Sequence, residues 1–328
     1  MRIESSVTSV SWLPSEAVEG MPRLPFDVGL AHYDPPPPDR LDDLAQLRHE
    51  NAVRAANELR AWIEVEDDRI VAHGFDTAAF VNPPRVRAAA VAFRAAELPS
   101  VASEPEVGDK WVRFVHTAGG QIGLPAPRRV LEKPFFRLSS SVTWTTLQLI
   151  LHANGEAHAS LTGASPFPRH WVYDGEGTLR QKSGTLDFEG WHRETFGERT
   201  PWGDEDAPAV ATDAESELER ALSAQVMRSG AATSRRRLEP GETLVEQGEE
   251  GRDLFLLLDG VLDVTVDDEV VAQVGPGAIL GERALLEGGV RTATLRAVTA
   301  CRVVVFSGFA LDADALAALA DTRRREER

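Results

Sequence analysis

The segment LGERALLEGGVRTATLRA, residues 280–297, places one acid and one base in a run of small and apolar residues. Glu282 and Arg291 stand nine positions apart. A guanidinium carries a fixed charge and a fork of N–H donors that suits phosphate, and a carboxylate accepts hydrogen bonds from sugar hydroxyl groups. Gly281 lets the backbone approach a ligand closely. These residue types predict a pocket for a small anion that carries a ribose.

The residues between the acid and the base fit the same chemistry. RALLE can form one helical turn whose N–H groups point toward an anion. Gly288 and Gly289 then turn the chain, Thr292 adds a hydroxyl beside the base, and Ala293 leads into a strand. Before this segment, residues 231–279 contain short strands separated by glycine, which is typical of a β-sandwich or β-roll. A short helix is predicted for residues 311–323, with arginines at its C-terminal end.

Residues 235–310 resemble a cyclic nucleotide-binding domain, as found in catabolite activator-type regulators and in cyclic nucleotide-dependent protein kinases. The resemblance rests on Gly248, Gly251 and Gly260 in GEEGRDLFLLLDGVLDV and on the segment 280–297, which resembles the phosphate-binding cassette of the family. The nine-residue spacing from Glu282 to Arg291 is the one of the kinases.

The resemblance implies the ligand and its contacts. Glu282 would hold the ribose 2′-hydroxyl and Arg291 the cyclic phosphate. The other expected contact residues are Gly281, Arg283, Ala284, Thr292 and Ala293. The implied ligand is cAMP or cGMP. A Thr after the Arg occurs in cGMP-selective members and also serves cAMP binders, and the bacterial character of the sequence favours cAMP.

Two alternatives concern the roll itself. It could be a vestigial domain in which Glu282 and Arg291 form a buried structural pair. It could also be a metal-dependent cupin, but the last histidine is His192, so the roll lacks the imidazole ligands of such sites. No metal is therefore expected. About 20 residues follow the roll, too few for a dimerisation helix and a helix-turn-helix, so no DNA-binding module is expected.

The predicted fold is mainly β with a few helices. It has a β-rich N-terminal domain (residues 1–205), a connecting helix and linker (206–234) and a jelly-roll-like double-stranded β-roll with a short C-terminal helix (235–328). Thr212 and Glu215 have the form of a capping box. Leu218, Leu222 and Val226 follow at helical spacing. The sequence also predicts helices at residues 41–59 and, weakly, 84–95.

The N-terminal region contains histidines that could act as metal ligands or acid–base groups. His152 and His158 flank Asn154-Gly155, a strong hairpin signal. A two-residue loop would place them on opposite faces, which disfavours a shared metal. The further pairs are His170 with Asp174 and His192 with Glu194, which are more typical of packed or surface residues. The acidic run 201–208 is typical of a solvated linker. No catalytic residue is assigned, and residues 1–230 resemble no family that we recognise.

The composition limits the partners. The chain has 328 residues, 42% of them hydrophobic, and a net charge of −17, which disfavours DNA and anionic membranes. The single cysteine, Cys301, cannot form an internal disulfide. No signal peptide and no apolar run of the ~20 residues that span a membrane is present. We therefore expect a cytoplasmic protein.

The expected function is that of a cyclic-nucleotide-binding regulatory protein that couples ligand capture to the N-terminal domain, to an unknown protein partner or to a second copy. One alternative is a nucleotide-gated enzyme with an unidentified N-terminal activity. The other is a structural scaffold with a vestigial roll.

Overall fold

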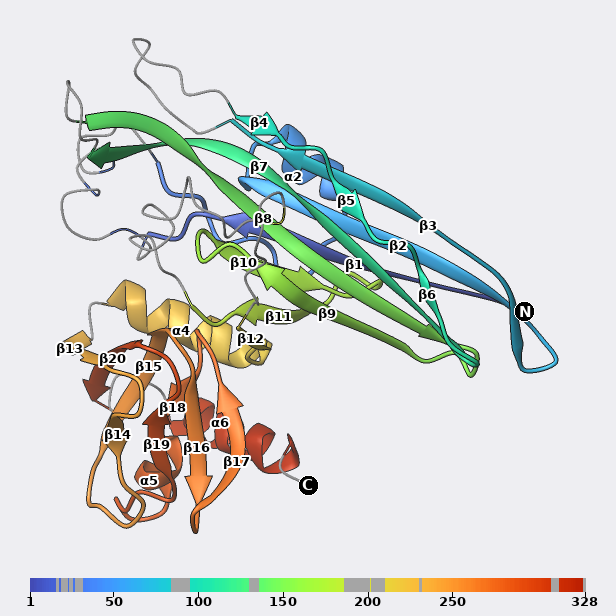
Figure 1. Ribbon diagram of the computed structural model, residues 1–328. Helices are drawn as coiled ribbons and strands as arrows, with labels where there is room; N and C mark the ends of the chain where they lie inside the picture. Colours follow the sequence, from blue (N-terminus) through green and yellow to red (C-terminus); the bar gives the residue numbers. More distant parts are fainter. Residues whose placement is uncertain are drawn as a thin grey trace. The chain divides into compact units, whose positions relative to one another are not determined.

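The computed structural model describes residues 1–15, 32–83, 95–129, 136–185, 210–229, 232–307 and 313–326, together with residues 18, 23, 26 and 201. The chain forms two compact units, Met1–Ala209 and Val210–Arg328. Both are built mainly from antiparallel strands (Figure 1), which confirms the predicted fold class. Helix α4 belongs to the second unit. None of the helices in the described ranges is both long and apolar enough to cross a membrane.

The N-terminal unit is a sandwich of two antiparallel sheets. One has the strand order β11-β10-β1-β2-β3; in the other, β7 pairs with β8 and β8 with β9, while three short strands pair with β7. The strands of this unit, with helix α2 (Leu44–His49), are β1 (Arg2–Trp12), β2 (Ala55–Glu66), β3 (Arg69–Val81), β4 (Ala96–Glu97), β5 (Val101–Ala102), β6 (Glu106–Val107), β7 (Trp111–Arg129), β8 (Phe136–His152), β9 (Ala157–Ala164), β10 (Arg169–Tyr173) and β11 (Leu179–Ser183).

The interior of this sandwich is partly polar. Alternate apolar residues such as Leu59 and Leu147 are buried, but Asn57 donates from Nδ2 to the backbone oxygens of Thr145 and His116. Its Oδ1 lies 2.6 Å from Nδ1 of His116, and Ser9 Oγ lies 2.6 Å from the Thr145 hydroxyl. Because buried polar groups need partners, this network fixes the register of the two facing sheets.

The C-terminal unit is a roll of two four-stranded sheets, with orders β13-β20-β15-β18 and β14-β19-β16-β17. A short strand, β12 (Ala211–Asp213), precedes the roll. The other elements are α4 (Glu217–Ser229), β13 (Ala232–Leu238), β14 (Thr243–Val245), β15 (Asp253–Asp259), β16 (Leu262–Val266), β17 (Glu269–Val274), β18 (Ile279–Leu280), α5 (Glu282–Leu286), β19 (Thr294–Ala297), β20 (Cys301–Ser307) and α6 (Ala313–Glu326).

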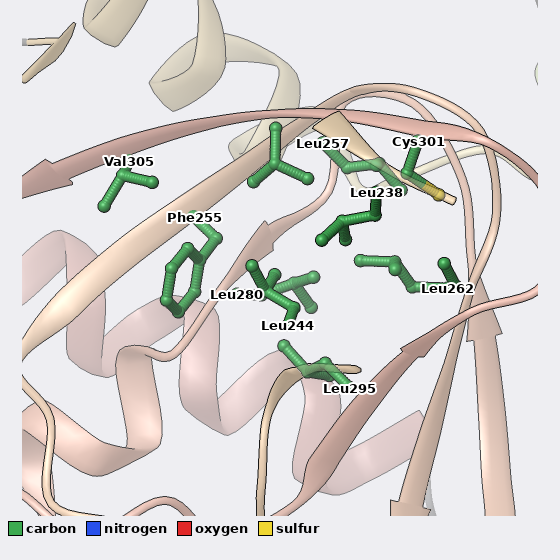
Figure 2. Close-up of a cluster of buried hydrophobic side chains, with 11 residues drawn as sticks. Leu238, Leu244, Phe255, Leu257, Leu262, Leu280, Leu295, Cys301 and Val305 are labelled. Atoms are coloured by element: carbon green, nitrogen blue, oxygen red, sulfur yellow. The ribbon is translucent and has the colours of Figure 1, made fainter. Parts of the chain in front are cut away.

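Strand alternation gives this unit two apolar layers. Phe255 and Leu257 of β15 point between the two sheets, where they pack with residues such as Leu262 and Leu295 (Figure 2). Leu254 and Leu256 point to the opposite face, where α4 and α6 cover the sheet. The face that each residue takes follows from the period of two along a strand.

Three local predictions were wrong. The helix expected at residues 41–59 is only Leu44–His49, because Asn51 has a φ of 53° and Ala55 begins β2, whose sheet pairing overrides the helical pattern. The capping box is Ser216 with Glu219, since Glu219 N donates to Ser216 Oγ (3.2 Å) and Ser216 N to Glu219 Oε2 (3.2 Å). Thr212 lies in β12 instead. The predicted helix at 84–95 falls almost wholly outside the described residues.

The third error concerns the hairpin of β8 and β9. Leu151 pairs with Ala157 and Ile150 with His158, and His152 N donates to Glu156 O. The loop is therefore longer than the Asn154-Gly155 pair, and the register is shifted by one residue from the predicted one. A shift of one residue moves a side chain to the other face of a sheet, so His152 and His158 lie on the same face.

His170 occupies a structural position in the sandwich. Its Nδ1 lies 2.8 Å from Ser11 Oγ, and its Nε2 lies 2.9 Å from the Ser165 backbone oxygen. Burial lowers the pKa of His170 from 6.5 to about 4. Burial lowers the pKa of His116 in the same way, also to about 4. Both imidazoles are thus neutral in the folded protein at neutral pH.

We predict that the N-terminal unit loses stability between pH 6.5 and pH 4. In this window the unfolded chain binds a proton at each of these histidines and the folded chain does not, so the free energy of unfolding falls as the pH falls. His170 alone contributes a loss of about 3 kcal/mol. Urea unfolding at several pH values, followed by tryptophan fluorescence, measures it, since all seven tryptophans precede Val210, where the second unit begins.

The variant His170→Asn removes the proton site and should flatten this pH dependence by about the same amount. The matched variant His49→Asn changes an exposed histidine of α2 and should leave the slope unchanged. An identical slope for His170→Asn and the parent protein contradicts the prediction.

Candidate functional site

The segment from Gly281 to Ala293 forms a connected loop around Arg291. Gly281 links β18 to the single turn of α5 and has a φ of 93°. A Cβ atom at Gly281 would lie 2.7 Å from Nη1 of Arg291 and 2.9 Å from the backbone oxygen of Asp253. After α5, Gly289 N donates to Ala284 O at 2.6 Å, which closes the loop. Glycine at 281 is therefore required both by its dihedral angle and by space.

The guanidinium of Arg291 is held from three sides. Nη1 donates to the backbone oxygen of Asp253 at 2.9 Å, and Cζ lies 4.9 Å from the centre of the Phe255 ring. A Cβ at Gly251 would lie 2.7 Å from Nη2. The backbone of Arg291 also donates to Glu249 O (2.8 Å). The side chain is thus placed by β15 and by the loop that precedes it.

The charge of Arg291 is incompletely neutralised. The residue is only 5% exposed, and burial lowers its pKa, while the carboxylates of Asp253 and Glu249 raise it. Neither carboxylate forms an ion pair with it: within the described part of the chain, its hydrogen bond goes to a backbone oxygen and its second contact is an aromatic ring. Since a buried charge is costly unless it is paired, this site favours the entry of an anion.

The predicted contact residues fall into two groups. Glu282, which is 3% exposed, and Ala284 are buried residues of α5. Arg291, which follows α5 in the chain, is buried as well. The partly exposed ones are Gly281, Arg283, Thr292 and Ala293. The structure brings Gly281 and Arg291 into direct proximity. The ligand roles of all seven residues stay predictions.

Sequence reasoning missed the support of the guanidinium. The side chain of Phe255 and the backbone oxygen of Asp253 lie in a strand that looks, in sequence, like any buried strand. Gly251 was noted only as part of a glycine pattern, although a Cβ there would displace the guanidinium of Arg291. To find these partners, one would have needed to know which residues of β15 lie next to the cassette.

Helix α4 is attached to the segment that leads into this loop. Oε2 of Glu219 accepts the capping bond from Ser216, and Oε1 accepts a hydrogen bond from Ile279 N at 3.4 Å. A Cβ at Gly277 (φ 103°) would lie 2.4 Å from Oε1 of Glu215. The N-terminal end of α4 and Glu215 before it are therefore close to residues 277–279, which end two positions before Gly281.

The N-terminal unit has a groove of about 1100 Å³ on the outer face of β1, β2 and β3, beside α2. Its lining is polar and contains both arginines and acidic side chains. Three of its arginines are paired with neighbouring acids: Arg2 with Glu4 (2.6 Å), Arg60 with Glu58 (2.9 Å) and Arg180 with Asp174 (2.6 Å). Because these charges neutralise one another, we assign no reaction to the groove.

The other N-terminal candidates gain no catalytic role. His170 is committed to its serine partners, and Asp174 accepts hydrogen bonds from the backbone of Glu176 and Thr178 in a turn. His192, Glu194 and residues 202–208 of the acidic run lie outside the described residues. No cluster of three or more His, Cys, Asp or Glu side chains in the described ranges is placed to hold a metal ion.

Residues 235–313 match the family model of the cyclic nucleotide-binding domain. This confirms the family that the sequence motifs predicted for this segment. A cGMP-dependent protein kinase of Plasmodium berghei (strain Anka) is 45% identical over 64 residues, which are 19% of this chain and 8% of the kinase. The similarity thus spans a small part of the kinase, and the kinase's activity does not follow for this chain.

Solved structures are similar over the same part of the chain. The structure named "Sp-2Cl-cAMPS bound to PKAR CBD2" is 30% identical, with a TM-score of 0.25, and the match covers 28% of this chain and 62% of that one. The Thermus thermophilus Catabolite Activator Protein is 26% identical with a TM-score of 0.28, and the match covers 34% and 56% of the two chains.

We predict that Gly281→Ala destabilises the C-terminal unit more than Gly288→Ala does. Both residues have φ above 90°, which costs about 1–2 kcal/mol for alanine. A Cβ at Gly288 meets nothing within 4 Å, whereas one at Gly281 meets Arg291 and Asp253. Reactivity of Cys301 with a thiol reagent in urea measures unfolding of this unit, since this single cysteine is buried in its core. Equal midpoints for the two variants would contradict the prediction.

Proposed function

We propose that the C-terminal unit binds a cyclic nucleotide, cAMP or cGMP, and that the protein is a sensor of this ligand. The observation that carries the proposal is the buried guanidinium of Arg291, which lacks an ion pair within the described residues and lies in a cassette of the matching family. A cyclic phosphate brings one negative charge and acceptor oxygens, which are what this site lacks. The kinase relative, named as cGMP-dependent, fits the same ligand class.

In this proposal each cassette residue has a role. Arg291 pairs with the cyclic phosphate, and Glu282, buried at the start of α5, accepts a hydrogen bond from the ribose 2′-hydroxyl. Gly281, Arg283 and Ala284 would contact the ligand through their backbone. Thr292 and Ala293, which are partly exposed and directly precede β19, would border the phosphate. The hydroxyl of Thr292 is compatible with either base, and cAMP is the favoured one.

Helix α4 transmits the effect of ligand binding to the rest of the protein or to a partner. Glu219 connects the capping bond of α4 to Ile279 N, two residues before Gly281. A ligand that draws the cassette toward its phosphate changes the position of this segment, and α4 must follow it or lose the bond. Such a shift needs a difference in ligand affinity between the two arrangements. The receiver is the N-terminal unit, a protein partner or a second copy of the chain.

We predict that Arg291→Ala strongly weakens nucleotide binding. Loss of the partner of a buried phosphate should cost about 2–5 kcal/mol, a reduction in affinity of roughly thirty-fold to several thousand-fold. Calorimetric titration of the full chain with cAMP and with cGMP measures this loss and identifies the preferred base. Arg296→Ala is the matched control, since Arg296 is exposed on β19, five positions further along the chain.

Two results would overturn the proposal. One is the absence of binding to the parent protein at millimolar concentrations of either nucleotide, which would leave the vestigial scaffold as the better account. The other is an Arg291→Ala variant that binds as tightly as the parent protein while its Cys301 stays protected.

We predict that the ligand lowers amide hydrogen exchange in α4 and that Glu219→Ala removes this effect. The substitution breaks both the capping bond and the bond to Ile279. Ser216→Ala removes the hydroxyl that caps Glu219 N, which costs about 1 kcal/mol. It leaves the bond from Ile279 N to Glu219 in place, so the ligand effect should persist in that variant. Exchange mass spectrometry with and without nucleotide measures it. An unchanged α4 in the parent protein at saturating ligand would refute the coupling, although not the binding.

A further inference from the structure

The two histidines at the end of the β8–β9 hairpin lie side by side. His152 ends β8, and His158 pairs across the hairpin with Ile150, two residues before His152. Residues two apart on a strand share a face. The ring centres of the two imidazoles are 5.3 Å apart, with an angle of 89° between the ring planes. The adjacent residues Leu149 and Leu151 are buried on the opposite face.

Both imidazoles are accessible from solvent. His158 is exposed and His152 is half-buried. The loop between them is held by backbone bonds from His152 N to Glu156 O and from Gly155 N to His152 O. These bonds keep the two strand ends in a fixed register, so the separation of the rings does not depend on a mobile backbone.

The separation of the rings matches that of a metal chelate. A zinc–nitrogen bond is ~2.1 Å long, and the centre of an imidazole lies ~1.1 Å behind its nitrogen. Two imidazoles at a tetrahedral angle around one metal therefore have ring centres ~5 Å apart. The planes of the two rings can turn independently about their bonds to the metal. Rotation of the side chains is then sufficient, and no backbone movement is required.

We propose that His152 and His158 chelate one late first-row divalent cation, such as Zn²⁺ or Cu²⁺. Imidazole suits these metals, whereas Mg²⁺ and Ca²⁺ prefer oxygen ligands. The remaining coordination positions are filled by water, since the described residues place no third His, Cys, Asp or Glu in such a group. The metal joins the last residue of β8 to the second residue of β9. It thus stabilises the N-terminal unit and is independent of the nucleotide site.

A spectroscopic reporter lies next to the site. Trp111 of β7 is the direct cross-strand partner of His152, so both side chains emerge on the same face. Cu²⁺ quenches the fluorescence of a nearby indole, and bound Cu²⁺ should therefore reduce the tryptophan emission of the full-length chain. Zn²⁺ does not quench in this way and serves to measure the change in stability.

The experiment titrates the full chain, without a polyhistidine tag, with Zn²⁺ by calorimetry and with Cu²⁺ by fluorescence. The parent protein should bind one equivalent of either metal. His152→Ala and His158→Ala should each lower the affinity at least tenfold, and their thermal midpoints without metal should stay close to that of the parent. Zn²⁺ should raise the midpoint of the parent protein and of neither variant.

The matched control is His49→Ala, which removes an exposed histidine of α2 and should leave the metal affinity unchanged. Three results would overturn the proposal. They are the absence of binding at millimolar metal, a His158→Ala variant with the parent's affinity, and an equal loss in His49→Ala. Any of them would leave the two rings as an edge-to-face aromatic pair.

Discussion

The C-terminal unit depends on keeping the guanidinium of Arg291 in a buried place. Solvation by water is lost there, and the chain replaces it only in part, with the backbone oxygen of Asp253 and the face of Phe255. Two glycines, Gly251 and Gly281, flank it, and a Cβ atom at either position would displace the guanidinium from this place. Phe255 also belongs to the core between the two sheets. Phe255 therefore both contacts the charge of Arg291 and packs in the core of the roll.

The two units differ in what they bury between their sheets. The roll has two apolar layers. One lies between its sheets, and the other lies between one sheet and the helices α4 and α6. The N-terminal unit instead places polar groups between its sheets, among them Asn57, His116 and Thr145, and satisfies them mutually. A partly polar interior of this kind specifies one alignment of the sheets, because any sliding would leave buried donors and acceptors without partners.

The sequence was sufficient for the parts of the molecule that local chemistry determines. The Asn154-Gly155 pair located the β8–β9 hairpin, and the spacing of Glu282 and Arg291 located the cassette. It was insufficient where tertiary pairing decides. The alanine-rich residues 51–59 follow a helical pattern but lie largely in a sheet. The His152–His158 hairpin differs by one residue of register, which the Asn154-Gly155 pair does not specify. The support of Arg291 by β15 required strand order, which no local pattern contains.

The crowding of Arg291 by two glycines also has an evolutionary meaning. Gly251 and Gly281 are distant in sequence, yet each is restricted by the same guanidinium. In a lineage that loses the arginine, the space beside Gly251 opens, and selection against a side chain there relaxes. Gly281 keeps a separate restriction from its positive φ and from the Asp253 carbonyl. In relatives without the arginine, residue 251 should therefore vary more than residue 281.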